Sequence, residues 1–275
     1  MSAGMERAVR PPAVAGLFYP GAPDVLRRTV AELLDGASIP AGAVPKAVPK
    51  AVPKAVIVPH AGYVYSGAIA AKAIRRFAPH AADIRRIVLL GPTHRVAVRG
   101  LAAPSVSAFD TPLGRVPVDQ AAIDTVRDLP QVVIDDAAHA AEHSLEVQLP
   151  LLQRVLPQFS LVPFAVGMVD GDQVAEVLDR LWGGDETRIV ISSDLSHYLS
   201  YDRARAMDAA TAAAIERLDA GPIGFDQACG RLPVAGLLAC ARRRGLKAER
   251  VELKNSGDTA GSKDKVVGYG AWAFA

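Results

Sequence analysis

Residues 55–63 read Ala-Val-Ile-Val-Pro-His-Ala-Gly-Tyr, and this stretch decides the class of fold. Its first four residues form a short apolar run with β-branched side chains, which is typical of a strand covered on both faces. Runs of the same kind occur at 86–90, 161–166 and 188–192. Repeated buried strands of this length indicate a sheet in the interior of the protein.

Helical patterns separate these strands along the chain. They lie at 66–77, 142–156, 171–182, 202–218 and 233–244. This alternation predicts an α/β fold in three layers around a mostly parallel central sheet. Because crossover connections keep such strands parallel, those ending at Val58, Leu90 and Ser192 should have their carboxyl ends on one edge of one sheet.

The ends of the sequence complete a single predicted domain over residues 1–275. A helix is predicted at 24–34, with Asp24 as its N-cap. Strands are predicted at 249–253 and 266–274. Between the first helix and the first strand, Ala-Val-Pro-Lys occurs three times at 43–54, and the regular prolines favour an extended, solvated connector without chemistry of its own.

The composition excludes several classes of protein. The 31 basic and 29 acidic residues give a net charge of +2, too balanced for a nucleic-acid-binding domain. No apolar run approaches the ~20 residues that span a bilayer, and the N-terminal segment does not have the pattern of a signal peptide. Two cysteines cannot form a disulfide framework, so we expect a cytoplasmic protein with free thiols.

Histidines follow three of the predicted strands. His60, His94 and His197 come after the runs at 55–58, 86–90 and 188–192, and His143 lies at the predicted start of a helix. One such histidine is more often a hydrogen-bonding loop residue than a ligand, but ligands bind at the carboxyl ends of strands in open α/β sheets. Three histidines at that edge predict a functional pocket. Two further histidines have no assigned role: His80 and His139.

The two cysteines have different surroundings in the sequence. Cys229 precedes a proline-started helix, where neighbouring imidazoles and the helix N-terminus should lower the pKa of its thiol. Cys240 lies in an apolar helical stretch and should be inert and buried. Asp194 either orients an imidazole or caps the loop after its strand. Glu142 is either a pocket acid or a first-turn residue that complements the helix dipole.

Several of these segments, in order along nearly the whole chain, resemble the Memo family, whose bacterial and archaeal members are often called AmmeMemoRadiSam system protein B. The segments are Pro59-His-Ala-Gly-Tyr-Val-Tyr-Ser-Gly67, Leu90-Gly-Pro-Thr-His94, Glu142-His-Ser-Leu-Glu146, Ser192-Ser-Asp-Leu-Ser-His197 and Cys229-Gly-Arg-Leu-Pro233. The opening Ala15-Gly-Leu-Phe-Tyr-Pro20 and the closing Val267-Gly-Tyr-Gly-Ala271 are also similar to that family. The resemblance implies a fold like that of the class III extradiol dioxygenases, which hold non-haem Fe(II) at strand ends.

The resemblance also implies roles for seven residues. A metal would be bound by His60, His94 and Cys229, with His197 nearby as acid/base. The same pocket would be lined by the candidate catalytic residues Asp194, Glu142 and His143. Iron (Fe²⁺) is the expected cofactor, with copper or zinc as alternatives, because a thiolate replaces the carboxylate that dioxygenases use and is a softer ligand.

Three hypotheses for function follow. The first is a metal-dependent oxidoreductase that acts on O₂ or a small-molecule substrate. The second is a metal-free or zinc hydrolase with Cys229 as nucleophile, His197 as base and Asp194 as the residue that orients the base. The third is a non-enzymatic module that binds a ligand or a partner protein within a radical-SAM-associated system. No nucleic-acid or membrane partner is expected.

Overall fold

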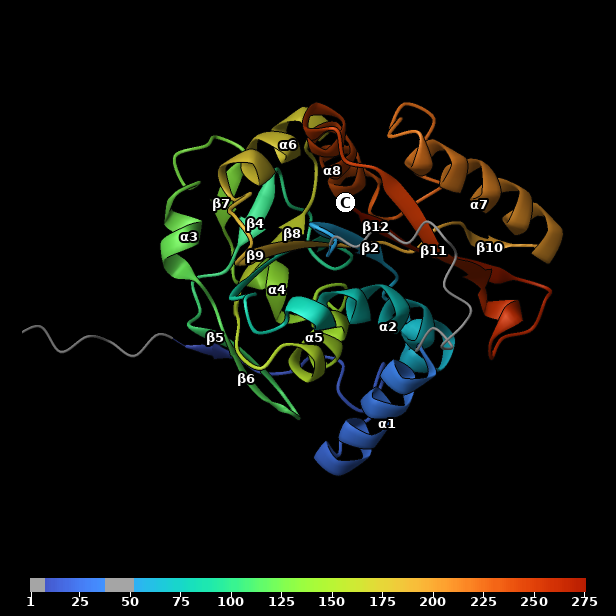
Figure 1. Ribbon diagram of the computed structural model, residues 1–275, viewed down its shortest axis with the longest axis horizontal. Coiled ribbons are helices and arrows are strands. Elements are labelled where there is room, and N and C mark those ends of the chain that lie inside the picture. Colours follow the sequence, from blue (N-terminus) through green and yellow to red (C-terminus); the bar gives the residue numbers. More distant parts are fainter. Residues whose placement is uncertain (1–7, 38–51) are drawn as a thin grey trace, which may run out of the picture.

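The computed structural model describes residues 8–37 and 52–275, and its central feature is a nine-stranded mixed sheet (Figure 1). The strands run in the order β10-β12-β2-β9-β3-β8-β4-β7, and β11 pairs with β12. The four strands at the centre are mutually parallel. They are β2 (Ala55–Val58), β9 (Thr187–Ser192), β3 (Arg86–Pro92) and β8 (Ser160–Val166).

The central strands align their carboxyl ends as the sequence predicts. Val58 of β2 pairs with Ser192 of β9, and Leu90 of β3 pairs with Ile191 of β9. Every residue of β2 and β9 is buried, which explains why their sequences are continuous apolar runs without a polar alternation. The prediction that these three strands end on one edge of one sheet is confirmed.

Further strands flank this centre. In the large sheet they are β12 (Val266–Phe274), β11 (Ala248–Asn255), β10 (His197–Leu199), β4 (Leu101–Ala103) and β7 (Val132–Ile134). A second sheet of three strands contains β1 (Val9–Arg10), β5 (Ala108–Thr111) and β6 (Gly114–Pro117). The short strands between 97 and 140 were not predicted.

Helices cover both faces of the large sheet and form the outer two layers (Figure 1). One layer contains α1 (Pro23–Gly36), α2 (Ala68–Ile74) and α5 (Leu149–Val155). The other contains α6 (Gly171–Arg180) and α8 (Arg231–Arg244), while α7 (Tyr201–Glu216) packs on β11 and β12. Two short helices are α3 (Gln120–Asp124) and α4 (Ala137–Ala140). The predicted three-layer α/β architecture is therefore confirmed.

Two details of the helix predictions are wrong. The N-cap of α1 is Ala22, and Asp24 lies in the first turn, because Pro23 at the first helical position has no N–H that requires a cap. Residues 142–145 are not helical; a 3₁₀ turn begins at Glu146 and α5 at Leu149. The carboxylate of Glu142 accepts hydrogen bonds from nearby backbone N–H groups, and such local bonds compete with a helix.

Some expectations extend beyond the described residues. The single domain over 1–275 stays a prediction, and residues 43–51 of the Pro-rich repeat lie outside the described part of the chain. None of the helices in the described part combines the length and the apolar character that a membrane span requires.

Candidate metal centre

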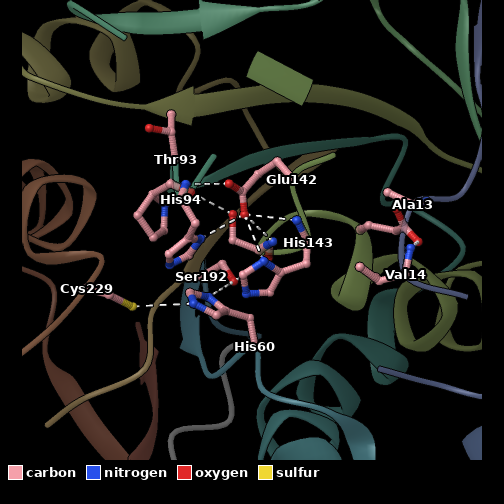
Figure 2. A network of polar contacts seen from close by, with 12 residues as sticks. Ala13, Val14, His60, Thr93, His94, Glu142, His143, Ser192 and Cys229 are labelled. Atoms are coloured by element: carbon pink, nitrogen blue, oxygen red, sulfur yellow. Dashed lines mark hydrogen bonds and ion pairs between the residues drawn. The ribbon is translucent and has the colours of Figure 1, made fainter. Parts of the chain in front are cut away.

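Three loops at the carboxyl edge of the central strands bring His60, His94 and Cys229 together (Figure 2). His60 follows β2, His94 follows β3, and Cys229 directly precedes the N-cap of α8. One donor atom from each lies within 4.8 Å of the other two. These separations meet the limit of ~5 Å that two bonds of ~2.0–2.3 Å to one ion allow.

The hydrogen bonds of Ser192 determine which nitrogen of His60 is free. The Ser192 hydroxyl donates to the carbonyl of Ser144 at 2.6 Å and accepts from Gln148 Nε2 at 3.0 Å. Its single proton is thus used, so it accepts from His60 Nδ1 at 2.8 Å, and Nδ1 must be protonated. We infer that His60 presents a bare Nε2, which lies 3.4 Å from Cys229 Sγ.

The amide of Gln148 supports this assignment. Its Nε2 also donates to the carbonyl of Pro59 at 2.9 Å, which fixes the orientation of the amide because only the nitrogen can donate to a carbonyl. Burial lowers the pKa of His60 well below its usual range, and His94, His143 and His197 lower it further. His60 is therefore neutral at neutral pH, as a metal ligand must be.

Glu142 orients the second imidazole. His94 Nδ1 donates to Glu142 Oε1 at 2.9 Å, and the backbone N–H of His94 donates to Oε2 at 2.6 Å. Backbone N–H groups of His143 and Ser144 also donate to Oε1. Burial alone would raise the pKa of Glu142, but the hydrogen bonds from His94 and the backbone lower it to about 2. An ionised Glu142 therefore leaves Nε2 of His94 as the ligand atom.

His143 is a neighbour of the donor set. Its ring centroid lies 4.5 Å from that of His94 and 5.3 Å from that of His60, and burial lowers its pKa to about 4. His94, Glu142 and His143 also lie close enough to share an ion. Four N–H groups already occupy the Glu142 carboxylate, so we favour the group that contains Cys229.

The thiol of Cys229 differs from the sequence-based expectation. Burial, together with the nearby Asp194, raises its pKa to about 12. The expected net lowering is wrong because burial and Asp194 outweigh the hydrogen bonds from Asp194, Ser193 and Gly230, which act in the lowering direction. The backbone N–H of Asp194 donates to Sγ at 3.3 Å and holds the sulfur beside His60.

Asp194 and His197 take different positions. Asp194 is buried; its Oδ1 accepts from the backbone N–H of His60 at 2.7 Å, and its Oδ2 lies 4.0 Å from His60 Nε2. Burial raises the pKa of Asp194 to about 7. His197 begins β10 and is exposed, and within the described residues no hydrogen bond joins its ring to Cys229. The thiol instead contacts His60, so the nucleophile and base of the hydrolase hypothesis are not paired.

Sequence reasoning did not assign roles to Ser192, Gln148 and Ser144. Ser192 offers a weak indication, since it is a buried hydroxyl at the end of an otherwise apolar strand. The other two act through contacts with residues far away along the chain, so no local pattern identifies them.

Comparison with known proteins identifies the family of this chain. A sequence profile described as Memo-like protein matches residues 10–273. The chain belongs to the Memo family. A MEMO1 family protein from Aquifex aeolicus (strain VF5) is 37% identical over 274 residues, which cover 95% of this chain and 97% of that protein. A MEMO1 family protein from Methanopyrus kandleri is 34% identical and covers 98% of this chain and 99% of its own length.

Among solved structures, an uncharacterized protein from Escherichia coli K12 is similar in fold to this Memo family chain. The TM-score is 0.53 at 14% sequence identity, and the match covers 78% of this chain and 98% of that one. At this level of identity the similarity concerns the fold alone.

Proposed function

We propose that this Memo family protein is a metal-dependent redox enzyme whose ion is bound by His60 Nε2, His94 Nε2 and Cys229 Sγ. The convergence of these three donors within 4.8 Å is the observation that supports it. Fe²⁺ is the metal we favour, with copper or zinc as alternatives, because the set combines imidazole with thiolate. A bound ion of this kind supplies Lewis acidity and, for iron or copper, electron transfer to a coordinated small molecule.

The residues around the donors hold the imidazoles and move protons in this proposal. Glu142 and Ser192 accept from the Nδ1 atoms of His94 and His60 and so fix both rings. Asp194, whose Oδ2 lies 4.0 Å from His60 Nε2, and the exposed His197 would be the groups that exchange protons with the site and with solvent. His143 lines the pocket as a neutral imidazole.

The substrate in this proposal is a small molecule that takes the positions of the ion left free by the protein. Any radical-SAM chemistry would belong to a partner protein, because two cysteines cannot bind an iron–sulfur cluster through four thiolates.

Metal analysis of protein purified anaerobically under reducing conditions tests the proposal, with Cys240 as a matched control. Wild type should retain about one ion per chain. Cys229→Ser should lose the metal, whereas Cys240→Ser should retain it and lose on the order of 1 kcal/mol of stability, because a hydroxyl would replace a packed, buried thiol. Retention by Cys229→Ser, or equal loss from both variants, would contradict the assignment of the thiol.

A further inference from the structure

A glycine in the closing segment of the chain makes room for a carboxylate from another element. Gly268 is buried in β12, and a Cβ placed on it would lie 2.1 Å from Oδ2 of Asp208. Non-bonded carbon and oxygen atoms do not approach so closely, so only glycine fits while the carboxylate stays in place. Asp208 belongs to α7, which packs against β10, β11 and β12 at one end of the large sheet (Figure 1).

Asp208 uses this space to reach the segment that follows β9. Its Oδ1 accepts a hydrogen bond from the backbone N–H of Ser196 at 3.1 Å. Both residues are buried, with exposed fractions of 3% and 0%. A buried backbone N–H requires an acceptor, and the side chain of Asp208 supplies it here. The carboxylate therefore fixes a backbone group of the pocket from a helix outside it.

The backbone of Gly268 holds the same segment. The N–H of Leu195 donates to the carbonyl of Gly268, and the N–H of Gly268 donates to the carbonyl of Ser196, both at 2.8 Å. His197 is paired with the preceding residue of β12. Residues 195–197 are thus held both by β12 and by the carboxylate from α7. We call Asp208 and Gly268 together the clamp.

The residue just before this segment joins two of the loops that carry metal donors. The backbone N–H of Asp194 donates to Cys229 Sγ at 3.3 Å, and its carbonyl accepts from the backbone N–H of Cys229 at 3.3 Å. Its Oδ1 accepts from the backbone N–H of His60 at 2.7 Å. The position of Asp194 therefore sets the position of the thiol relative to the imidazole.

A second glycine prevents the start of the segment from moving. Gly230, the N-cap of α8, donates its N–H to Ser193 Oγ at 3.0 Å. A Cβ on this glycine would lie 2.6 Å from the Cβ of Ser193 and 2.8 Å from the preceding carbonyl oxygen. Backbone packed this closely cannot shift toward α8. A displacement that begins at Ser196 must therefore be taken up at Asp194.

We propose that Asp208 is a positioning residue for the candidate metal centre. Its carboxylate holds Ser196 and so keeps Asp194 where the two donor loops meet. Gly268 is required because it leaves room for that carboxylate. The inference rests on the proposed metal site, but it also concerns the thiol alone, whose position can be measured without metal. It gives α7 a role in the site although no metal donor lies on that helix.

Affinity for Fe²⁺, measured anaerobically by competition with a chelator, tests the proposal. Asp208→Ala removes the acceptor and Gly268→Ala displaces it, so we expect each to lower the affinity per folded molecule by roughly tenfold. The double variant should bind Fe²⁺ about as well as either single variant, because the added methyl group fits once the carboxylate is gone. Asp208→Asn keeps an acceptor for Ser196 and should retain most of the affinity.

Thiol labelling of the metal-free protein gives a second readout. With Cys240→Ser in every protein, a disulfide reagent reacts with Cys229 alone, because the sequence contains only two cysteines. We expect Asp208→Ala and Gly268→Ala to speed this labelling by on the order of tenfold, since the backbone N–H that holds the sulfur would no longer be fixed. Asp208→Asn should label at nearly the rate of the parent protein.

Gly236→Ala is the matched control. A Cβ on this glycine would lie 2.4 Å from Cγ1 of Val174, where α8 crosses α6, so the substitution disturbs a close contact outside the clamp. It should change stability but neither readout. If Gly268→Ala alone does not fold, folding of the double variant supports the contact with Asp208. Failure of the double variant to fold where Asp208→Ala folds overturns that contact.

The outcomes separate the clamp from the metal site. If wild type binds Fe²⁺ and the clamp variants change both readouts no more than Gly236→Ala does, the clamp is overturned and the metal site stands. Losses of affinity that add in the double variant also overturn the clamp. Absence of Fe²⁺ binding by wild type overturns the metal site. Faster labelling of Cys229 in the clamp variants would then still support the clamp, and unchanged labelling would overturn it.

Discussion

Glu142 and Glu146 lie four residues apart, and both side chains are buried, yet they serve different parts of the molecule. Glu142 accepts from His94 and from the backbone beside the pocket. Glu146 accepts from Arg10 Nη1 at 2.7 Å, from Tyr19 Oη at 2.5 Å and from the backbone N–H groups of Ala13 and Val14. One carboxylate orients a candidate ligand, and the other fixes the N-terminal segment onto the core.

The comparison shows that burial of a charge does not identify function. Both carboxylates are saturated with donors, as a buried charge requires. They differ in the kind of donor, because an imidazole has a second nitrogen that can bind a metal and a guanidinium has none. Arg10 also donates to the backbone carbonyl of Glu142 at 2.7 Å, so the structural carboxylate and the functional one share a neighbour.

The largest expected effect is on stability. Glu146→Gln would leave the buried guanidinium of Arg10 without its ionic partner, and we expect a loss of about 3–5 kcal/mol in the free energy of unfolding. Denaturant titration measures this loss. The metal content per folded molecule should not change; a selective loss of metal would show that the two carboxylates do not have separate roles.

His139 extends the comparison to imidazoles and gives a pH dependence. His139 is buried beside Arg10, whose Nε donates to its backbone carbonyl. Burial lowers the pKa of the His139 imidazole from 6.5 to about 4. The unfolded chain therefore binds a proton at higher pH than the folded chain does. Stability should fall as the pH decreases from 6.5 to 4, by roughly 3 kcal/mol for this group.

A His139→Gln variant isolates this contribution, because other buried histidines also titrate and Gln keeps a donor toward the carbonyl of Ala102. Unfolding free energies of both proteins at pH 7 and pH 4 give the difference. A wild-type profile parallel to that of the variant would rule out His139 as the source.

At the candidate metal centre, Glu142→Gln should mainly lower the affinity of the protein for the metal. The amide cannot accept from all four N–H groups, so His94 would lose its fixed orientation. We expect affinity for the metal to fall by about 10–100-fold, as measured by competition with a chelator. Glu146→Gln is the matched control, and an equal decrease in its affinity would remove the distinction between the two sites.

The smallest expected effect concerns Ser192, the neutral hydrogen-bond partner of the His60 imidazole. Ser192→Ala removes the acceptor of His60 Nδ1–H, and metal affinity should fall by roughly 2–10-fold, since a neutral hydrogen bond is weaker than one to a carboxylate. Nitrogen NMR of the metal-free protein should show His60 protonated at Nδ1 in wild type and a mixture of tautomers in the variant. Protonation at Nε2 in wild type would refute our assignment.

How much could be predicted from the sequence depends on whether a feature is local to one segment of the chain. Cys229 was assigned to the site only through the resemblance to the Memo family, whereas the central strands and the places of His60 and His94 follow from apolar runs and from the position of each residue relative to a strand end. Such positions are local properties of the chain. The strands β4 to β7 were missed because each has only three or four residues; β4 and β7 also depend on distant partners, whereas β5 and β6 pair with each other as a local hairpin.

Electrostatic properties were the least predictable. The pKa of Cys229 depends on how deeply the thiol is buried and on its distance from Asp194, and neither is visible in the sequence. Glu142 was identified as a pocket residue, but its predicted place on a helix was wrong because its own side chain captures the backbone N–H groups. The role of Ser192 as an acceptor could be assigned only once its hydroxyl proton was known to be donated to the carbonyl of Ser144.

The last strand in chain order, β12, has a consequence for how the protein is made. It pairs with β2, β10 and β11, so the edge of β2 beside it has no strand partner until β12 has been synthesised. His60 stands just beyond β2 and His197 begins β10, so neither side of the pocket can be completed on the ribosome before that point. Contacts between segments so far apart form slowly and leave a sheet edge open to aggregation in the meantime. We therefore expect metal uptake to begin only after β12 has been synthesised.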